Sequence, residues 1–145
     1  MQHIVRLGEL TVVVLKDGAE TNGQFCLCEV SVAPNTKRTF GHKHHTFDQT
    51  VVGMDGLLVW ALGGEQVVVG PSERLFIPRG TPHRFWNRQG YPARFLCIYS
   101  PAVITLEFFE SLHDAEELDA EERSAQIIAL LTRFGSAPAG NFQAN

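Results

Sequence analysis

The sequence predicts one all-β domain followed by a short helical segment. Short apolar runs alternate with turn residues at intervals of roughly 8–12 residues between positions 10 and 99, a spacing typical of a β-sandwich or barrel. Gly63-Gly64 separates two of these runs and favours a tight hairpin, because glycine adopts positive φ without a steric cost. After Ser100-Pro101 the apolar residues follow a helical period instead. The strands therefore precede the helices along the chain.

The candidate strands are short and closely spaced. They cover residues 4–7, 10–15, 24–32, 49–52, 57–62, 65–69, 74–77, 83–87 and 93–99. Further turns are expected at residues 55–56 and 88–90, where a glycine permits a tight reversal.

Two helices are expected after the last strand. Thr105 is in position to cap the first, which carries Leu106, Phe108, Phe109 and Leu112. Asp119 begins the second with an acidic first turn, and its apolar face is predicted to contain Ile127, Ile128, Leu131 and Phe134. Gly135 follows as a stop signal. We therefore expect a β-barrel domain with N-terminal strands over residues 1–112, a packed C-terminal helix over 113–135 and a flexible tail over 136–145.

Length and charge narrow the class of protein. The chain has 145 residues, 44% of them hydrophobic, and a net charge of -4, which fits a single domain with a sizeable core. Twelve basic and sixteen acidic residues without a basic block argue against nucleic-acid and membrane partners. The sequence starts without a secretory signal pattern and contains no run of 18 apolar residues, so a cytoplasmic location is expected.

The three cysteines agree with a reducing compartment. Cys26, Cys28 and Cys97 are an odd number, which argues against a disulfide framework. Cys26 and Cys28 share one face of a strand, and we expect them to be buried thiols rather than metal ligands.

The histidines are the candidate functional residues of the chain. His42 and His44 project to the same face of an extended strand, so their imidazoles can converge on one ion. His83 follows a Pro-x-Gly turn and could supply a third nitrogen from across a barrel. His45 should point to the opposite face. His3 and His113 have no partner in the sequence and are expected at the surface.

Two motifs carry a family resemblance. The first is His42-x-His44-x4-Gln49-x6-Gly56, and the second is Pro78-x-Gly80-x2-His83-x3-Asn87. In this order they resemble the two motifs of the cupin superfamily, except that the family has Glu where Gln49 stands and Gly where Ser72 stands. Within the superfamily the chain is similar to small single-domain cupins of the quercetin dioxygenase-like type. The resemblance implies a double-stranded β-helix, or jelly-roll barrel, with the helices packed outside it.

The resemblance also implies a metal site. His42, His44, Gln49 and His83 would bind one divalent ion, which could be Fe, Mn, Ni or Zn. A neutral carboxamide in place of a carboxylate leaves the ion with about +2 instead of about +1 net charge and so makes it a stronger Lewis acid. Asp48 competes with Gln49, because strand alternation counted from His44 places Asp48 inward. We favour Gln49 because the motif spacing selects it.

Alternation extends this site into a pocket. Phe85 and Asn87 share the face of His83, whereas Val51 and Gly53 share the face of Gln49. Gly53 either gives the site extra room or marks a β-bulge. Further aromatic surface comes from Phe40, Phe47, Phe76, Trp60 and Tyr99. Arg79 and Arg84 either bind the carboxylate of a substrate near the opening of the pocket or are solvated.

These features predict a metal-dependent enzyme acting on a small oxygen-rich or aromatic molecule. Because of the subfamily resemblance, a dioxygenase-type reaction comes first. The alternatives are a non-redox isomerase, lyase or cyclase, and a binding module without turnover. No catalytic residue is assigned. The apolar strands at 4–7 and 10–15 predict a homodimer, since bare edge strands favour association.

Overall fold

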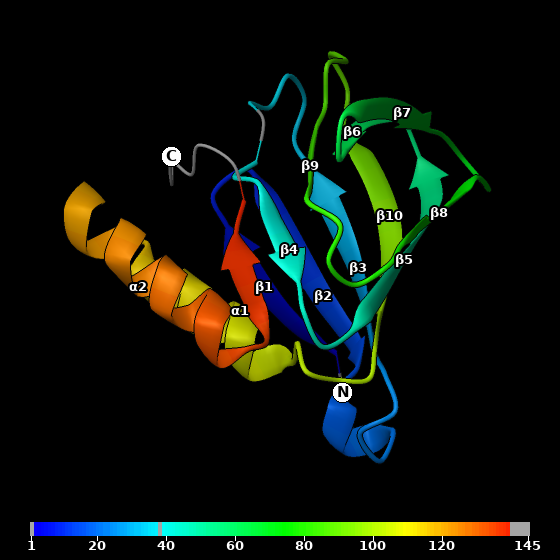
Figure 1. Cartoon of the computed structure of the whole chain (residues 1–145). Helices are drawn as coiled ribbons and strands as arrows, with labels where there is room; N and C mark the ends of the chain where they lie inside the picture. Colours follow the sequence, from blue (N-terminus) through cyan, green and yellow to red (C-terminus); the bar gives the residue numbers. More distant parts are fainter. Residues whose placement is uncertain (1, 38, 140–145) are drawn as a thin grey trace.

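Two antiparallel sheets and two C-terminal helices make up the molecule (Figure 1). The computed structural model describes residues 2–37 and 39–139. One sheet has the order β1-β2-β3-β10-β5-β8 and the other β11-β4-β9-β6-β7. The first consists of β1 (His3–Leu7), β2 (Leu10–Lys16), β3 (Cys26–Val32), β10 (Ala93–Ser100), β5 (Asp48–Asp55) and β8 (Arg74–Ile77). The second consists of β11 (Ser136–Pro138), β4 (His42–His44), β9 (His83–Trp86), β6 (Leu58–Leu62) and β7 (Glu65–Val69). This confirms the predicted all-β double-stranded β-helix with helices that follow it.

Strand alternation builds the core. Along β3, every second side chain is buried, beginning with Cys26 and ending with Val32. Cys28 lies opposite Cys97 on β10, and both are free thiols, as is Cys26. Burial raises the pKa of the Cys26 thiol to about 12. The cysteines therefore act as small apolar core residues, as predicted.

The predicted hairpin at Gly63-Gly64 is confirmed. Strands β6 and β7 pair from Leu58↔Val69 to Leu62↔Glu65, so that the two glycines form the whole connection. Gly63 has a φ of 56°, which a residue with a side chain adopts only at a cost.

Helix α1 (Leu106–Ala115) has a different cap from the predicted one. Thr105 occupies the N-cap position, but its side chain makes no capping hydrogen bond. Instead, Asp17 Oδ1 accepts a hydrogen bond from the Leu106 N–H at 3.1 Å and another from the Gly18 N–H at 2.9 Å. Asp17 is also the N-cap of the short 3-10 helix η1 (Gly18–Glu20). One carboxylate therefore ties the β2–β3 connection to the start of α1.

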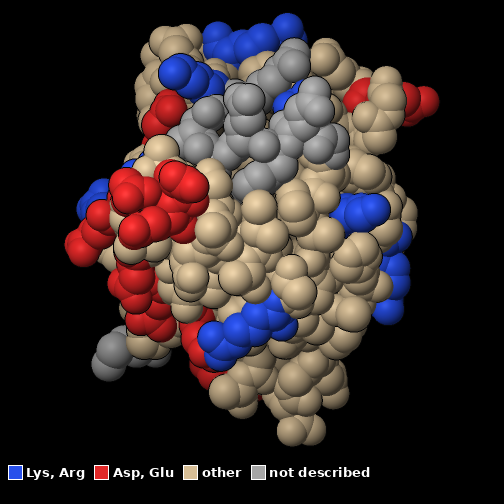
Figure 2. All heavy atoms as spheres, turned by 60° about the vertical axis from the view of Figure 1, so that its left-hand side comes forward, with Lys and Arg blue, Asp and Glu red and all other residues tan. Residues whose placement is uncertain are grey.

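Helix α2 (Ala120–Arg133) begins as predicted, with Asp119 accepting a hydrogen bond from the Glu122 N–H at 2.9 Å. The buried face of α2 differs from the predicted one at a single position. Ile127, Leu130, Leu131 and Phe134 are buried, whereas Ile128 is 39% exposed. The buried residues follow the spacing i, i+3, i+4 and i+7, and Ile128 lies beyond the edge of that stripe. The exposed acidic residues Glu116, Glu117, Asp119, Glu121 and Glu122 flank the start of α2, and acidic side chains gather on this face of the molecule (Figure 2).

The expected tail from Ser136 onward is structured at its start. Gly135 has a φ of 67° and turns the chain out of α2, after which Ser136–Pro138 pairs with β4 as β11. Residues 140–145 of the expected tail lie outside the described residues. No helix in the described ranges is both long and apolar enough to cross a membrane.

Candidate metal centre

Two neighbouring strands of one sheet bring three histidines together. His42 and His44 lie on β4, and His83 lies on β9, where it is the registered partner of His42. One ligand atom from each of the three side chains lies within 4.8 Å of the other two. The ring centroids are 4.4 Å apart for His42 and His83, and 4.9 Å apart for each of the other two pairs. The predicted convergence of the three imidazoles is therefore present.

Each ring is oriented by an oxygen at its Nδ1 atom. His42 Nδ1 lies 3.3 Å from the Phe40 carbonyl oxygen, and His83 Nδ1 lies 2.9 Å from the Thr81 carbonyl oxygen. His44 Nδ1 lies 2.8 Å from the Ser136 hydroxyl oxygen. A carbonyl only accepts hydrogen bonds, so His42 and His83 donate from Nδ1 and keep the lone pair on Nε2. The Nε2 atom of His83 is buried and has no hydrogen-bond partner within the described part of the chain.

Burial keeps the three rings neutral. Loss of solvent, followed by the proximity of His83, lowers the pKa of His44 to about 3. Loss of solvent lowers the pKa of His83 to about 4, and the pKa of His42 is also lowered, by burial and by both neighbouring rings. Neutral imidazoles with available lone pairs are the form that binds a metal ion. The unsatisfied Nε2 of His83, the convergent geometry and the neutral rings all fit a divalent cation.

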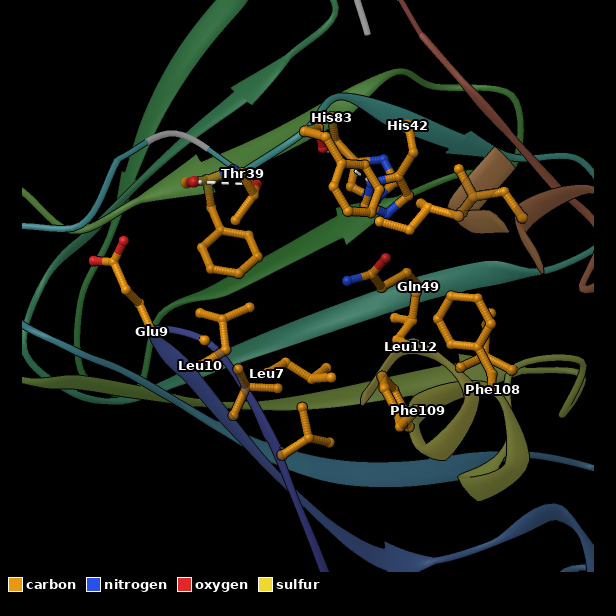
Figure 3. A pocket seen from close by; sticks show the side chains of 18 of the residues that line it. Leu7, Glu9, Leu10, Thr39, His42, Gln49, His83, Phe108, Phe109 and Leu112 are labelled. Carbon is orange, nitrogen blue, oxygen red and sulfur yellow. Dashed lines mark hydrogen bonds between the residues drawn. The ribbon is translucent and has the colours of Figure 1, made fainter. Parts of the chain in front are cut away.

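Gln49 faces the triad and Asp48 does not. The Gln49 side chain is 4% exposed, and its Oε1 lies 3.0 Å from His44 Nε2. Its amide group points toward the rings of His42 and His83 (Figure 3). The Asp48 carboxylate instead accepts hydrogen bonds from the backbone N–H of Arg79 at 2.9 Å and from its guanidinium at 3.2 Å. Alternation from His44 does not continue to Asp48 because residues 45–47 break the strand between β4 and β5.

The triad and Gln49 line a cavity of about 580 Å³ (Figure 3). Its wall is mainly apolar and comes from three parts of the chain. The barrel contributes the aromatic residues Phe40, Trp60, Phe85, Phe95 and Tyr99. The β1–β2 hairpin contributes Leu7 and Leu10, and the helices contribute Phe108, Phe109, Leu112, Ile127 and Leu131. Exposed charged residues, among them Glu9, Lys37 and Glu116, line it as well and place its rim at the surface.

Several residues predicted near the site lie elsewhere. A Cβ on Gly53 would lie 2.0 Å from the Gly70 carbonyl oxygen, and the β5–β10 register shifts beside it, so Gly53 marks a bulge and adds no room. Phe76 is 57% exposed.

Phe47 lies behind the site and stacks on the His44 ring with centroids 4.2 Å apart. Asn87 is buried and donates to the Ala33 and Tyr91 carbonyls, which makes it structural. Arg84 lines a smaller hollow that also touches His83.

Sequence reasoning missed two groups of site residues. The sequence predicts Ser136 to lie in the tail, and it indicates the cavity residues of α1 and α2 only as helix packing positions. Ser136 is separated from His44 by 92 residues, and no local pattern signals a single serine that becomes a hydrogen-bond partner. The apolar helix faces gave a signal for burial, but not for the cavity that they line.

The buried histidines predict a pH-dependent stability for the metal-free protein. Their pKa values are lowered in the folded state, so the unfolded chain binds more protons below about pH 6.5 and folding becomes less favourable as pH falls toward 4. Each such histidine contributes a slope of about 1.4 kcal/mol per pH unit. In chelator-treated protein, His44→Ala should reduce the slope of the unfolding free energy between pH 6 and 5 by about that amount, as measured by urea denaturation. His45→Ala is the matched control, because it removes a neighbouring imidazole that is exposed. An unchanged slope in His44→Ala would show that this ring is not buried neutral.

The position of Gln49 predicts its effect on metal retention. Gln49→Glu should slow release of the ion to a chelator by about tenfold, because a carboxylate donor adds a negative charge to the donor set. Gln49→Ala should speed release, though less than loss of a histidine, since water can fill the vacant position. Asp48→Asn is the matched control and should change little, because its carboxylate faces Arg79. A Gln49→Ala protein that retains its ion like the parent would rule out Gln49 as a ligand.

Known proteins share this architecture. The Cupin_2 family model, described as a cupin domain, matches residues 28–99. The chain is 36% identical over 75 residues to the tetracenomycin polyketide synthase protein TcmJ of Streptomyces glaucescens, which covers 52% of this chain and 50% of that protein. It is 28% identical over 71 residues to the uncharacterized protein MJ1618 of Methanocaldococcus jannaschii, with coverage of 49% and 57%. The match thus spans about half the length of these curated relatives.

Solved structures agree on the fold. A sugar phosphate isomerase from a cupin superfamily, from Silicibacter pomeroyi, superposes with a TM-score of 0.57 at 24% identity, over 65% of this chain and 60% of that one. KdgF from Halomonas sp. superposes with a TM-score of 0.59 at 16% identity, over 70% and 86%. The family model spans the strands that carry His42, His44, Gln49 and His83. Residues 28–99 of the chain therefore form a cupin domain.

Proposed function

We propose that the protein is a metal-dependent cupin enzyme that acts on a small, oxygen-bearing and largely apolar or aromatic molecule. The observation that carries this proposal is the convergence of three neutral imidazoles and the Gln49 amide on one wall of a mainly apolar cavity of about 580 Å³. Cavities of this size enclose small organic molecules, and their few polar groups orient the bound molecule.

The donor set favours non-redox chemistry. His42, His44, His83 and Gln49 carry no formal charge when the rings are neutral, so a bound divalent ion keeps its full positive charge. Such an ion supplies Lewis-acid polarisation of a substrate oxygen. Polarisation of this kind would suit isomerase, lyase or cyclase chemistry, in which a hydrogen next to a carbonyl is made more acidic. One of the similar structures is that of a sugar phosphate isomerase, which supports the same choice.

The protein side chains supply orientation and proton donors. Burial, followed by the neighbouring Cys97, raises the pKa of the Tyr99 hydroxyl well above its usual range, so that it keeps its proton at neutral pH. The Trp60 indole N–H is buried, has no hydrogen-bond partner in the described ranges, and belongs to a residue that lines the cavity. The Tyr99 hydroxyl can donate a hydrogen bond to an oxygen of a bound molecule, whereas the Trp60 N–H is itself too buried to reach one. The aromatic wall excludes water and accommodates flat rings.

A dioxygenase-type reaction is the second candidate. Two observations support it: the resemblance of the motifs to quercetin dioxygenase-like cupins, and the aromatic residues that line the cavity. A binding module without turnover would use the same cavity. The cytoplasmic location expected from the sequence stays a prediction.

The proposal predicts about one divalent ion per chain and carbonyl activation that depends on it. Tag-free protein should contain the ion by elemental analysis, His83→Ala should lose it, and the matched control His45→Ala should keep it. Zinc-loaded parent protein should exchange the hydrogens next to the carbonyl of hydroxylated aromatic ketones or ketoses for deuterium in D₂O, as seen by NMR, because a polarised carbonyl acidifies them. His83→Ala should lose this exchange, and His45→Ala should retain it.

The two chemistries give different results in this experiment. Exchange with zinc, which has no redox chemistry, supports the non-redox assignment. Oxygen uptake by the iron- or manganese-loaded protein without such exchange would support the dioxygenase instead. Metal binding without exchange or oxygen uptake across the panel would favour the binding module. Equal metal content in the parent and His83→Ala would contradict the metal centre itself.

We also propose that the chain forms a homodimer through β1. This strand is at the end of its sheet, and its Ile4 side chain is 63% exposed. His113 of α1 donates to the Arg6 carbonyl at 2.7 Å, so the open part of the edge lies toward His3. An unprotected strand edge favours association. Light scattering at micromolar concentration should give twice the chain mass of 16.1 kDa. Ile4→Lys should shift the protein to monomer, whereas Val68→Lys, on the edge strand β7, should not. A monomeric parent would refute the dimer.

A further inference from the structure

The C-terminal strand places one side chain behind the metal centre. β11 pairs with β4 in the register Ser136↔His44, Ala137↔Lys43 and Pro138↔His42 (Figure 1). Ser136 therefore lies beside the strand that carries two of the three histidines, although it follows α2 in the sequence. Its side chain is buried, and its hydroxyl oxygen lies 2.8 Å from His44 Nδ1.

The Ser136 hydroxyl has a second partner that favours one direction for its proton. It donates to the Phe134 carbonyl oxygen at 3.2 Å. With its proton used in this way, the oxygen is an acceptor for the Nδ1–H of His44. His44 then carries its lone pair on Nε2, the atom that lies 3.0 Å from Gln49 Oε1. In this arrangement His44 Nε2 and Gln49 Oε1, which are both acceptors, face each other. A cation bound between them would satisfy both.

The hydrogen-bond partner of His44 does not fix its tautomer, unlike the partners of the other two histidines. His42 and His83 donate to backbone carbonyls, which only accept, and their tautomers are therefore fixed. A hydroxyl can also rotate and donate to Nδ1. The His44 proton would then lie on Nε2 and be donated to Gln49 Oε1. His44 thus has one tautomer open to an ion and another that is satisfied without an ion, and the Ser136 hydroxyl decides between them.

We propose that Ser136 is a positioning residue for the metal centre, whose hydroxyl selects the ion-binding tautomer of His44 and so makes metal retention depend on the docking of β11. This inference rests on the proposed metal binding. Outer partners of metal-bound histidines fix ring orientation and tautomer in this way.

The segment that carries Ser136 is held rigidly enough for this role. The His45 N–H donates to the Gly135 carbonyl at 2.7 Å, and the Ala139 N–H donates to the Gly41 carbonyl at 3.0 Å, so hydrogen bonds lie on both sides of Ser136. Gly135 combines positive φ with a close approach, because a Cβ there would lie 2.3 Å from Thr46 Oγ1. The turn from α2 into β11 is therefore tightly determined, and the hydroxyl is delivered to His44 by the packing of the C-terminal helix.

Zinc release from the full-length protein tests the proposal. Ser136→Ala should release zinc to a chelator about 10- to 100-fold faster than the parent, the range seen when an outer partner of a metal ligand is lost. Ser136→Thr retains the hydroxyl and should restore slow release. Thr132→Ala is the matched control, because it removes a hydroxyl that donates to the Ile128 carbonyl on the exposed face of α2. This variant should release zinc like the parent.

A second measurement tests the proposal on the parent protein itself, without relying on how well a variant folds. Histidine side-chain ¹H–¹⁵N spectra of the zinc-loaded parent should show the His44 proton on Nδ1, and those of Ser136→Ala should lose this protected signal. Equal release from the parent and Ser136→Ala, or a proton on Nε2 in the zinc-loaded parent, would overturn the role of Ser136 while leaving the metal centre intact. A parent protein that binds no zinc would overturn both.

Discussion

The pairing of His42 with His83 across β4 and β9 is the contact on which the candidate centre depends. It is the one registered pair between these strands, and it brings together the two sequence motifs that carry the histidines. His44 then packs between these two rings and Phe47, whose ring stacks on its outer side. Burial and the contact between the three imidazoles disfavour charge on any of them, so the geometry favours neutral rings. A cation is the partner that best compensates their convergent lone pairs.

Charge is arranged consistently around this neutral group. The one carboxylate next to Gln49 in the sequence, that of Asp48, points away from the cavity and binds Arg79, which holds the pKa of Asp48 below its usual range. Glu9 and Glu116 belong to the cavity wall but are exposed at its rim. Within the described residues, the groups that surround the three rings are therefore amide, hydroxyl, carbonyl and aromatic. An anionic or enolate-like oxygen of a bound molecule would find no competing negative charge beside the rings.

The parts of the fold that could be predicted from the sequence are those that depend on local patterns. Alternation along β3, the Gly63-Gly64 hairpin, the Asp119 cap and the inward direction of His42 and His44 each follow from a few neighbouring residues. The errors arose where distant segments meet. Asp17 caps α1 from 89 residues away, and Ser136 reaches His44 across 92 residues. The choice between Gln49 and Asp48 is intermediate between local patterns and contacts of distant segments. It depends on the break in the strand at residues 45–47, which the motif spacing indicates and simple alternation does not.

The candidate metal centre and the opposite walls of the cavity come from different parts of the chain. The matched family region, residues 28–99, contains the three histidines and Gln49. The walls opposite them come from outside that region, from Leu7 and Leu10 of the β1–β2 hairpin and from apolar side chains of α1 and α2. Family membership therefore supports the donor set, whereas the shape of the space available to a substrate depends on segments for which the family model offers no comparison. The same C-terminal segment that closes the cavity through α2 also delivers Ser136 to His44. Packing of α2 thus connects the wall of the cavity with the orientation of the His44 ring.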